Sequence, residues 1–300
     1  MYLRLALVIF FLALWPAPAS AREVRPVSVA VLDVGGSPSA SRVAERLAKM
    51  LASVNRADTK LSVLDRGLSR AAARGVGYAG SLNMTLAEAR ALGAAVGCDF
   101  FLTGDAQTVR RSSSARPVYY ESYASLFVVS AHTGRLVLWD RPAAVADTVE
   151  AAETALLAAL DAGAATRYVN AVAEAAAREE RERFAGEEGV TAAVIDLSTE
   201  AGAAANTDLR EPAPFRRLRP AYTDAAARAE AEATVDAVVE IGADGEVADV
   251  RVVRWAGFGL DEEVVATVRR MHFRPAQREG EPVPVRVLLR YNFRKPPKSS

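Results

Sequence analysis

Hydrophobic and polar residues alternate most regularly in the segment Val283–Phe293, close to the C-terminus. Every second residue from one end to the other is valine, leucine, tyrosine or phenylalanine, and polar side chains such as Arg286, Arg290 and Asn292 lie between them. Leu288 is the exception among the intervening positions. A period of two is typical of a strand with one face buried and the other in water. The pattern therefore predicts a long amphipathic strand.

The residues before this strand predict two more strands and a helix. The β-branched runs Thr234–Ile241 and Val247–Val253 flank an Asp244-Gly245 pair, which is a strong hairpin signal. From Leu260 to Met271 the apolar residues recur at helical spacing. The order of these elements predicts a ββαβ unit, a small sheet crossed by one helix.

The first half of the chain shows a different pattern, in which apolar strands alternate with amphipathic helices before a hairpin and an alanine-rich helix. The predicted strands are Pro26–Val34, Leu61–Leu64, Cys98–Thr103, Tyr119–Ser130 and Arg135–Trp139, and the predicted helices are Ser39–Leu51, Thr85–Val96 and Asp147–Leu160. This alternation is typical of an α/β domain. The fold class that we predict is α+β overall, with an N-terminal α/β domain of two or three layers, an alanine-rich helical linker and the C-terminal ββαβ domain.

The domain organisation follows from these patterns and from the first residues. The predicted segments are a signal peptide at 1–21, an α/β domain at 22–163, a helix and linker at 164–212, a ββαβ domain at 213–296 and a tail at 297–300. Arg4, an apolar run from Leu5 to Trp15 and small residues at Ala19 and Ala21 indicate an export signal. Because about twenty apolar residues are needed to span a bilayer, we expect a periplasmic protein rather than one anchored in the inner membrane.

Composition and motifs argue against several classes of function. Thirty-seven basic and 37 acidic residues balance, so nucleic-acid binding is not expected. Gly35-Gly36 lacks the remaining residues of a nucleotide-binding loop, and Asp65-Arg66 is interpreted as a structural pair. His132 and His272 have no partner at metal-ligand spacing, and Cys98 is interpreted as a core residue. We predict no catalytic residues, no metal site and no cofactor, and therefore not an enzyme.

Four short motifs carry a resemblance to a known family. They are Arg219-Pro220-Ala221-Tyr222, Asp244-Gly245, Gly259-Leu260-Asp261 and Phe273-Arg274-Pro275-Ala276. In this order they resemble the C-terminal domain of TonB-type energy transducers, over residues 213–296. Thr223 departs from the family, which usually has proline there. The family resemblance implies binding of the plug segment of an outer-membrane transporter by β-strand addition, and a role in TonB-dependent transport. The implied partner-binding residues are Pro220, Tyr222, Val285, Arg286, Val287, Leu288, Leu289, Arg290 and Tyr291.

The N-terminal half carries a looser resemblance. Val29–Asp33, Val63–Arg66, Gly97–Gly104 and His132–Arg135 resemble segments of the α/β domain shared by TolB-like and curli-secretion (CsgG-like) envelope proteins. That family uses such domains for assembly at the cell envelope and has no common catalytic site.

Two hypotheses about function remain open at this stage. The first is a periplasmic adaptor whose C-terminal domain binds a protein partner along the edge of its last strand. The second is an envelope scaffold whose N-terminal domain forms a homo-oligomer, without energy transduction.

Overall fold

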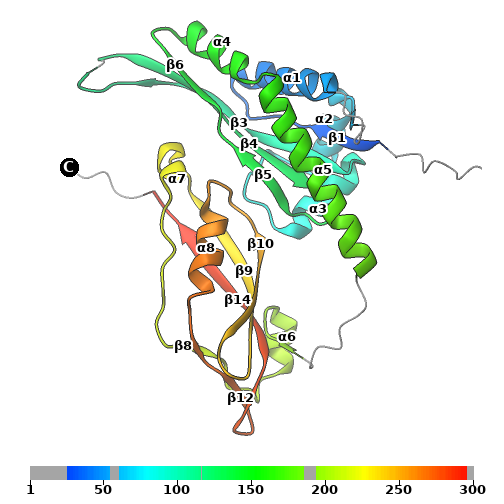
Figure 1. The fold of residues 1–300 in the computed structure, drawn as a ribbon, viewed down its shortest axis with the longest axis vertical. Coiled ribbons are helices and arrows are strands. Elements are labelled where there is room, and N and C mark those ends of the chain that lie inside the picture. The colour runs from blue at the N-terminus through cyan, green and yellow to red at the C-terminus, as the bar shows by residue number, and fades with distance from the viewer. Residues whose placement is uncertain (1–25, 55–60, 116, 186–193, 296–300) are drawn as a thin grey trace, which may run out of the picture.

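The computed structural model describes residues 26–54, 61–115, 117–185 and 194–295. The predicted signal peptide at 1–21 and the tail at 297–300 lie outside these ranges. Within the described ranges, no helix is both long and apolar enough to cross a membrane. The chain forms a larger α/β part at the N-terminal end and a smaller ββαβ-like part at the C-terminal end (Figure 1), in agreement with the predicted fold class.

The larger part is built on one mixed sheet with the strand order β2-β1-β3-β4-β5 and with β6 paired to β4. Its strands are β1 (Val27–Val31), β2 (Leu61–Val63), β3 (Phe100–Arg111), β4 (Tyr119–Ser130), β5 (Leu136–Asp140) and β6 (Ala143–Ala146). β1 runs parallel to both β2 and β3, whereas β4 is antiparallel to its neighbours. The predicted strand at Cys98–Thr103 extends much further, because its register with β4 continues to Arg111.

Helices cover both faces of this sheet, so the N-terminal part has three layers. On one face lie α1 (Pro38–Ser53), α4 (Val149–Ala159) and α5 (Ala162–Ala185), and on the other lie α2 (Arg66–Gly75) and α3 (Leu86–Val96). Alternate residues of β1 supply the two cores: Val29 and Val31 pack under α1, whereas Ala30 and Leu32 face the opposite side. This arrangement explains why the first strand is apolar at all positions except Ser28.

Local capping fixes the starts of these helices. Ser37 accepts a hydrogen bond from the Ala40 amide at the start of α1, and Thr85 and Glu88 form the predicted capping box of α3. The sequence pattern did not predict α2, which contains few apolar residues. Its N-cap is Asp65, whose carboxylate accepts from the Leu68 amide at 2.9 Å.

The smaller part has a four-stranded sheet in the order β10-β9-β14-β7, with the helix α8 (Leu260–Val268) across one face. Its strands are β9 (Ala233–Ile241), β10 (Val247–Arg254), β14 (Val285–Phe293) and the short parallel strand β7 (Ile195–Asp196). The predicted hairpin, helix and last strand are all present. The remaining short elements are α6 (Glu200–Ala205), β8 (Ala213–Pro214), α7 (Asp224–Ala229), β11 (Phe273–Arg274), β12 (Ala276–Arg278) and β13 (Glu281–Val283).

One of these elements, the helix α8, differs from the sequence prediction at its end, whereas the hairpin turn lies where it was predicted. The helix α8 ends at Val268 rather than Met271, because the chain turns there into β11. Gly245, in the predicted hairpin turn, has a φ of +83°, and a Cβ at this position would lie 2.0 Å from the Phe273 carbonyl oxygen. Glycine is therefore required at this turn for both its backbone angle and the close approach of the chain.

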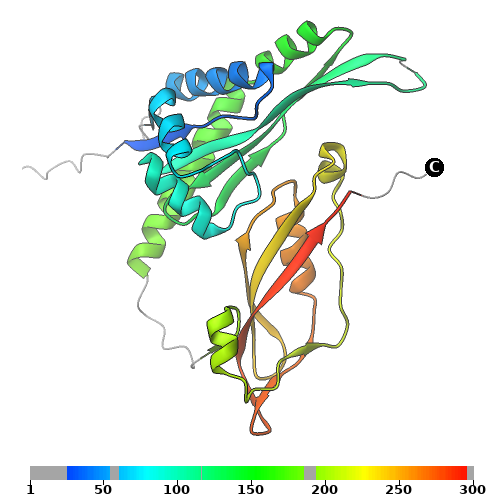
Figure 2. The same ribbon diagram turned by 180° about the vertical axis from the view of Figure 1, so that it is seen from behind.

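The loop between β10 and α8 lies next to the larger part (Figures 1 and 2), and its side chains belong to a hydrophobic cluster that both parts share. Trp255 is 1% exposed, stacks on Phe127 of β4 with ring centroids 5.7 Å apart, and donates from Nε1 to the Gly134 carbonyl at 3.1 Å. Phe258 packs edge-on to Phe127 at 5.6 Å and lies 5.7 Å from Trp139. An aromatic cluster therefore holds the smaller sheet against the larger one.

Candidate partner-binding edge

The strand that the sequence singles out, β14, lies near one edge of the smaller sheet. Its nine residues all pair with β9 on one side. On the other side, β7 pairs only with Val285 and Arg286. From Val287 to Phe293, no strand of the described chain pairs with this side of β14, which we call the open edge.

The direction of the backbone groups along the open edge follows from the contacts with β7. The amide of Leu197 donates to the Arg286 carbonyl at 2.8 Å, so the backbone groups of Arg286 point away from β9. Backbone groups of alternate residues in a strand point to the same side. Leu288, Arg290 and Asn292 therefore direct their amides and carbonyls toward the open edge, where another chain can pair with them.

The side chains of β14 divide between two faces as the alternation predicts. Val285 and Phe293 are buried on the face that packs on α8, and the Tyr291 hydroxyl lies 3.6 Å from the sulfur of Met271. On the other face, the Leu288 side chain is 39% exposed. Four of the predicted partner-binding residues therefore lie on the core side of the strand: Val285, Val287, Leu289 and Tyr291. A partner can contact only the parts of these side chains that reach the open edge.

The two arginines of β14 are already paired with carboxylates of β9. Arg290 donates to both oxygens of Asp236 at 2.7 and 3.0 Å, and Arg286 donates to Glu240 at 3.1 Å. Although burial opposes it, the hydrogen bonds and charges of Arg290 and Arg254 hold the pKa of Asp236 below its ordinary value. The arginines thus stabilise the sheet, and the open edge does not present them as unpaired charges.

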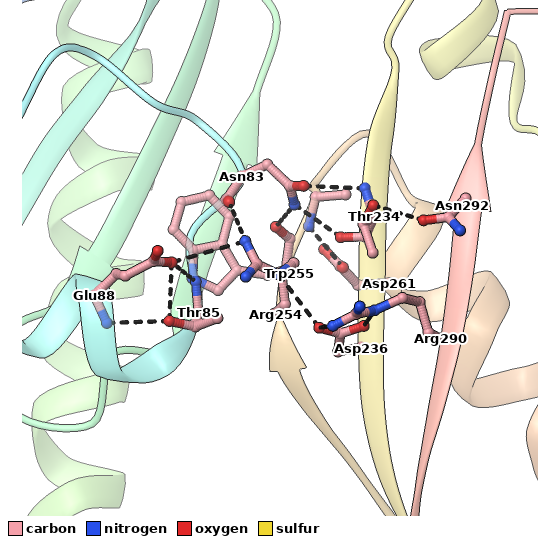
Figure 3. A network of polar contacts seen from close by, with 11 residues as sticks. Asn83, Thr85, Glu88, Thr234, Asp236, Arg254, Trp255, Asp261, Arg290 and Asn292 are labelled. Atoms are coloured by element: carbon pink, nitrogen blue, oxygen red, sulfur yellow. Dashed lines mark hydrogen bonds and ion pairs between the residues drawn. The ribbon is translucent and has the colours of Figure 1, made fainter. Parts of the chain in front are cut away.

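A polar chain connects the open edge with the N-terminal part of the molecule (Figure 3). Asp236 accepts from Arg290 and, at 3.3 Å, from Arg254 at the end of β10. The same Arg254 guanidinium donates to the Asn83 carbonyl at 2.9 Å and lies 3.7 Å from Glu88 of α3. A continuous series of ion pairs and hydrogen bonds therefore runs from Arg290 on β14, through Asp236 and Arg254, to Glu88 in the capping box of α3.

A second chain of hydrogen bonds runs in parallel with the first (Figure 3). Thr234 donates from its hydroxyl to the Asn292 side chain at 2.8 Å, and its amide donates to Asn83 Oδ1 at 3.0 Å. The Asn83 amide group donates in turn to the carbonyls of Thr234 and Trp255, at 2.8 and 2.6 Å. Asn83 thus bridges the two parts of the chain at the start of β9.

The sequence did not identify Asn83, Thr234, Asp236 or Arg254 as members of this network. One signal was present for Asp236 and Glu240. These two acidic residues are four positions apart in β9, and Arg290 and Arg286 are four positions apart in β14. The antiparallel register places Asp236 opposite Arg290 and Glu240 opposite Arg286. Asn83 carries no comparable signal, because it lies 151 and 172 residues away in the sequence from Thr234 and Trp255.

Of the two predicted partner-binding residues before α7, Pro220 and Tyr222, the structure places Tyr222 near the end of β14. The Tyr222 ring is 6.5 Å from that of Phe293, and its hydroxyl donates to the Ala231 carbonyl at 2.7 Å. The Tyr222 hydroxyl therefore has its hydrogen-bond partner within the C-terminal part. Pro220 is half-buried in the segment between β8 and α7.

The residues considered for chemistry take structural positions. Cys98 is buried in the hydrophobic core, and burial raises the pKa of its thiol to about 12. His132 lies 3.0 Å from Asp99, and His272 lies 2.8 Å from Glu246. Within the described ranges, no three histidine, cysteine or acidic side chains come together as a group that could hold a metal ion.

Residues 219–294 match the family model described as Gram-negative bacterial TonB protein C-terminal. The match confirms the resemblance predicted for the C-terminal part of the chain. No curated protein matches the chain. The predicted resemblance of the N-terminal part to TolB-like and curli-secretion proteins is not confirmed.

Three solved structures are among those similar to the chain. The C-terminal domain of TonB from Pseudomonas aeruginosa is 21% identical, over 35% of this chain and 96% of that chain, with a TM-score of 0.26. Lipoprotein GNA1162 from Neisseria meningitidis is 13% identical, over 48% and 99% of the two chains, with a TM-score of 0.31. The C-terminal domain of LpoB from Salmonella enterica is 20% identical, over 41% and 86%, with a TM-score of 0.27.

Proposed function

We propose that this protein is an adaptor of the cell envelope whose TonB-like region binds an extended segment of a partner protein along the open edge of β14. The observation that carries the proposal is a sheet edge, inside the region that matches the TonB family model, with which no strand of residues 26–54, 61–115, 117–185 and 194–295 pairs beyond Arg286. Strand addition suits this edge, because hydrogen bonds to Leu288, Arg290 and Asn292 supply affinity without any special side chain.

The chemistry of the edge defines the kind of segment that fits. An added strand would continue the two faces of the sheet. Its side chains on one face would lie beside Val287 and Leu289, which favours apolar residues. On the other face they would lie beside Leu288 and the paired Arg290, which favours small or polar residues.

Location and partner belong to the same proposal. The export signal expected at 1–21 and the family match support a periplasmic location, and the partner that best fits the family is the plug segment of an outer-membrane transporter. A role in TonB-dependent transport would follow from binding such a partner.

The test uses proline at one edge-facing position. Leu288→Pro removes a backbone N–H that points to the open edge and leaves the pairing with β9 intact. We expect the full-length variant to lose most of its affinity for purified plug segments of the source bacterium's transporters, measured by calorimetry, whereas Leu288→Ala keeps its affinity. Equal binding by the proline variant and the wild type would exclude this edge as the site.

A second candidate function is an envelope scaffold, and one feature of the fold favours it. The hairpin of β3 and β4 has 12 residues in each strand and extends well beyond the body of the sheet (Figures 1 and 2). Such an arm can pair with another copy of the chain. Sedimentation over a hundredfold range of concentration tests this function, and a strict monomer throughout would exclude it.

A further inference from the structure

A groove of about 590 Å³ lies where the two parts of the chain meet. Its walls come from β5 of the larger sheet and from β10 and α8 of the smaller part. In the strand order β10-β9-β14-β7, β10 and the open edge of β14 lie on opposite sides of β9. The groove is therefore separate from the open edge. Binding sites of this size occur preferentially between domains.

The first wall of the groove is the edge of β5. Four consecutive residues of this strand, from Leu136 to Trp139, line the groove. Successive side chains of a strand point to opposite faces, so a surface that all four share lies along the edge of the strand. β5 is the last strand of its sheet, and among the described residues only β4 pairs with it.

The pairing with β4 shows which backbone groups of β5 point into the groove. The amide of Ala124 donates to the Pro142 carbonyl, so the even-numbered residues of β4 direct their backbone groups toward this side. Leu138 and Asp140 pair with two such residues. Trp139, between them, therefore directs its amide and carbonyl away from β4, where an added strand can form hydrogen bonds with them.

The facing wall is a single stripe of α8 and its C-cap. Glu262, Val265, Ala266 and Arg269 follow one another at intervals of three, one and three residues, which places them on one side of the helix. The centre of the stripe is apolar, and its two ends carry opposite charges about 10 Å apart along the helix axis. Four residues of an extended strand also span about 10 Å. The two walls therefore have the same length.

Opposite charges at the two ends are what the groove offers to a ligand. Three of the five charged side chains that line it already have partners: Arg135 with Glu182, Arg251 with Asp249, and Asp261 with the amides of Ala256 and Gly257. The other two, Glu262 and Arg269, form no ion pair with any residue in the described ranges. One negative end and one positive end thus remain available.

We propose that this groove binds an extended segment of a partner protein, which adds to the edge of β5 and carries a basic residue and an acidic residue on either side of an apolar centre. The apolar centre packs against Val265 and Ala266, the basic residue lies beside Glu262, and the acidic residue lies beside Arg269. Main-chain hydrogen bonds to β5 supply the remaining affinity. A compact small molecule cannot use a wall made of strand backbone in this way.

The proposal is tested by fluorescence polarisation of the full chain with two labelled peptides. The first has lysine, three valines and glutamate at its centre and threonines at both ends, and the second has lysine in place of the glutamate. We expect saturable binding of the first peptide and about fivefold weaker binding of the second, which is the effect of one exposed ion pair. Arg269→Glu should reverse this preference. Arg270→Glu, at the adjacent exposed residue outside the groove, is the matched control and should keep it.

Two further variants locate the bound peptide. Ala266→Gln puts a polar side chain at the apolar centre of the stripe, at an exposed position where the fold tolerates it, and should weaken the binding of both peptides. Leu288→Pro should leave the binding of both peptides unchanged, because the open edge of β14 is a separate surface. A loss of binding in Leu288→Pro would place the peptides at the open edge and overturn the proposal.

Other results would also overturn it. These are no binding of either peptide by the wild type, and equal effects of Arg269→Glu and Arg270→Glu. Binding of anilinonaphthalene sulfonate without binding of the peptides would identify a small-molecule cavity instead. Self-association of the wild type that Ala266→Gln abolishes would assign the groove to a second copy of the chain.

Discussion

Asp236 is the residue on which the polar network of the smaller sheet depends. Its side chain is 5% exposed and accepts from two arginines. Removal of one partner of a buried ion pair leaves the other charge uncompensated. We expect Asp236→Asn to lower the free energy of unfolding by about 2 kcal/mol at pH 7, measured by denaturant titration. Glu240→Gln, at a site with 20% exposure, is the control and should have a smaller effect.

The sign of the pH dependence at Asp236 follows from its lowered pKa. The charged form stabilises the fold above the unfolded pKa of about 3.8, and this contribution is lost as the pH falls through the folded value. The difference in stability between wild type and Asp236→Asn should therefore be present at pH 7 and decrease below pH 4. A difference that stays constant down to pH 2 would contradict the assignment.

Asp261, in the Gly259-Leu260-Asp261 motif, should show the opposite dependence. Burial raises its pKa to about 6, although its carboxylate accepts from the amides of Ala256 and Gly257. Protonation therefore favours the folded state: the contribution is complete below about pH 3.8 and is lost as the pH rises through about 6. We expect the wild type to gain stability relative to Asp261→Asn between pH 7 and pH 4, measured by thermal unfolding. A constant difference would refute this.

Periodicity made most strands and helices predictable at the scale of single elements. The alternation in β14 and the Asp244-Gly245 turn depend on local residues, and both appear in the structure. In contrast, α2 and α7 are short and contain almost no large apolar residues, so the apolar pattern does not reveal them, and they begin at the caps Asp65 and Thr223. The open edge could only be inferred from the family resemblance, because it depends on where the distant strand β7 stops pairing.

Adjacent positions of β14 should respond differently to proline. The amide of Leu289 points to β9, whereas the amide of Leu288 points to the open edge. We expect Leu289→Pro to destabilise the protein by about 3 kcal/mol, since it breaks a ladder hydrogen bond inside the sheet. Leu288→Pro should cost much less. Equal losses in chemical denaturation would show that the backbone directions are assigned incorrectly.

At the scale of the whole molecule, the contact between the two sheets could not be predicted from the sequence. Trp255 lies between a predicted strand and a predicted helix, and nothing in the local pattern indicates that Phe127 is its partner. The contact nevertheless places the open edge at a defined position relative to the N-terminal part, through the aromatic cluster and the two polar chains. A partner bound at β14 would therefore be held at a defined position relative to the α/β part.

The aromatic contact gives the last prediction. Trp255→Ala removes a side chain that is 1% exposed, and such truncations cost about 3–5 kcal/mol when the cavity does not collapse. Because this side chain joins the two sheets, we expect the variant to unfold in two separate thermal transitions and to have a larger radius of gyration in X-ray scattering. Phe215→Ala, at a side chain that is 67% exposed, should keep the wild-type behaviour. A single transition with an unchanged radius would show that the polar chains alone hold the two parts together.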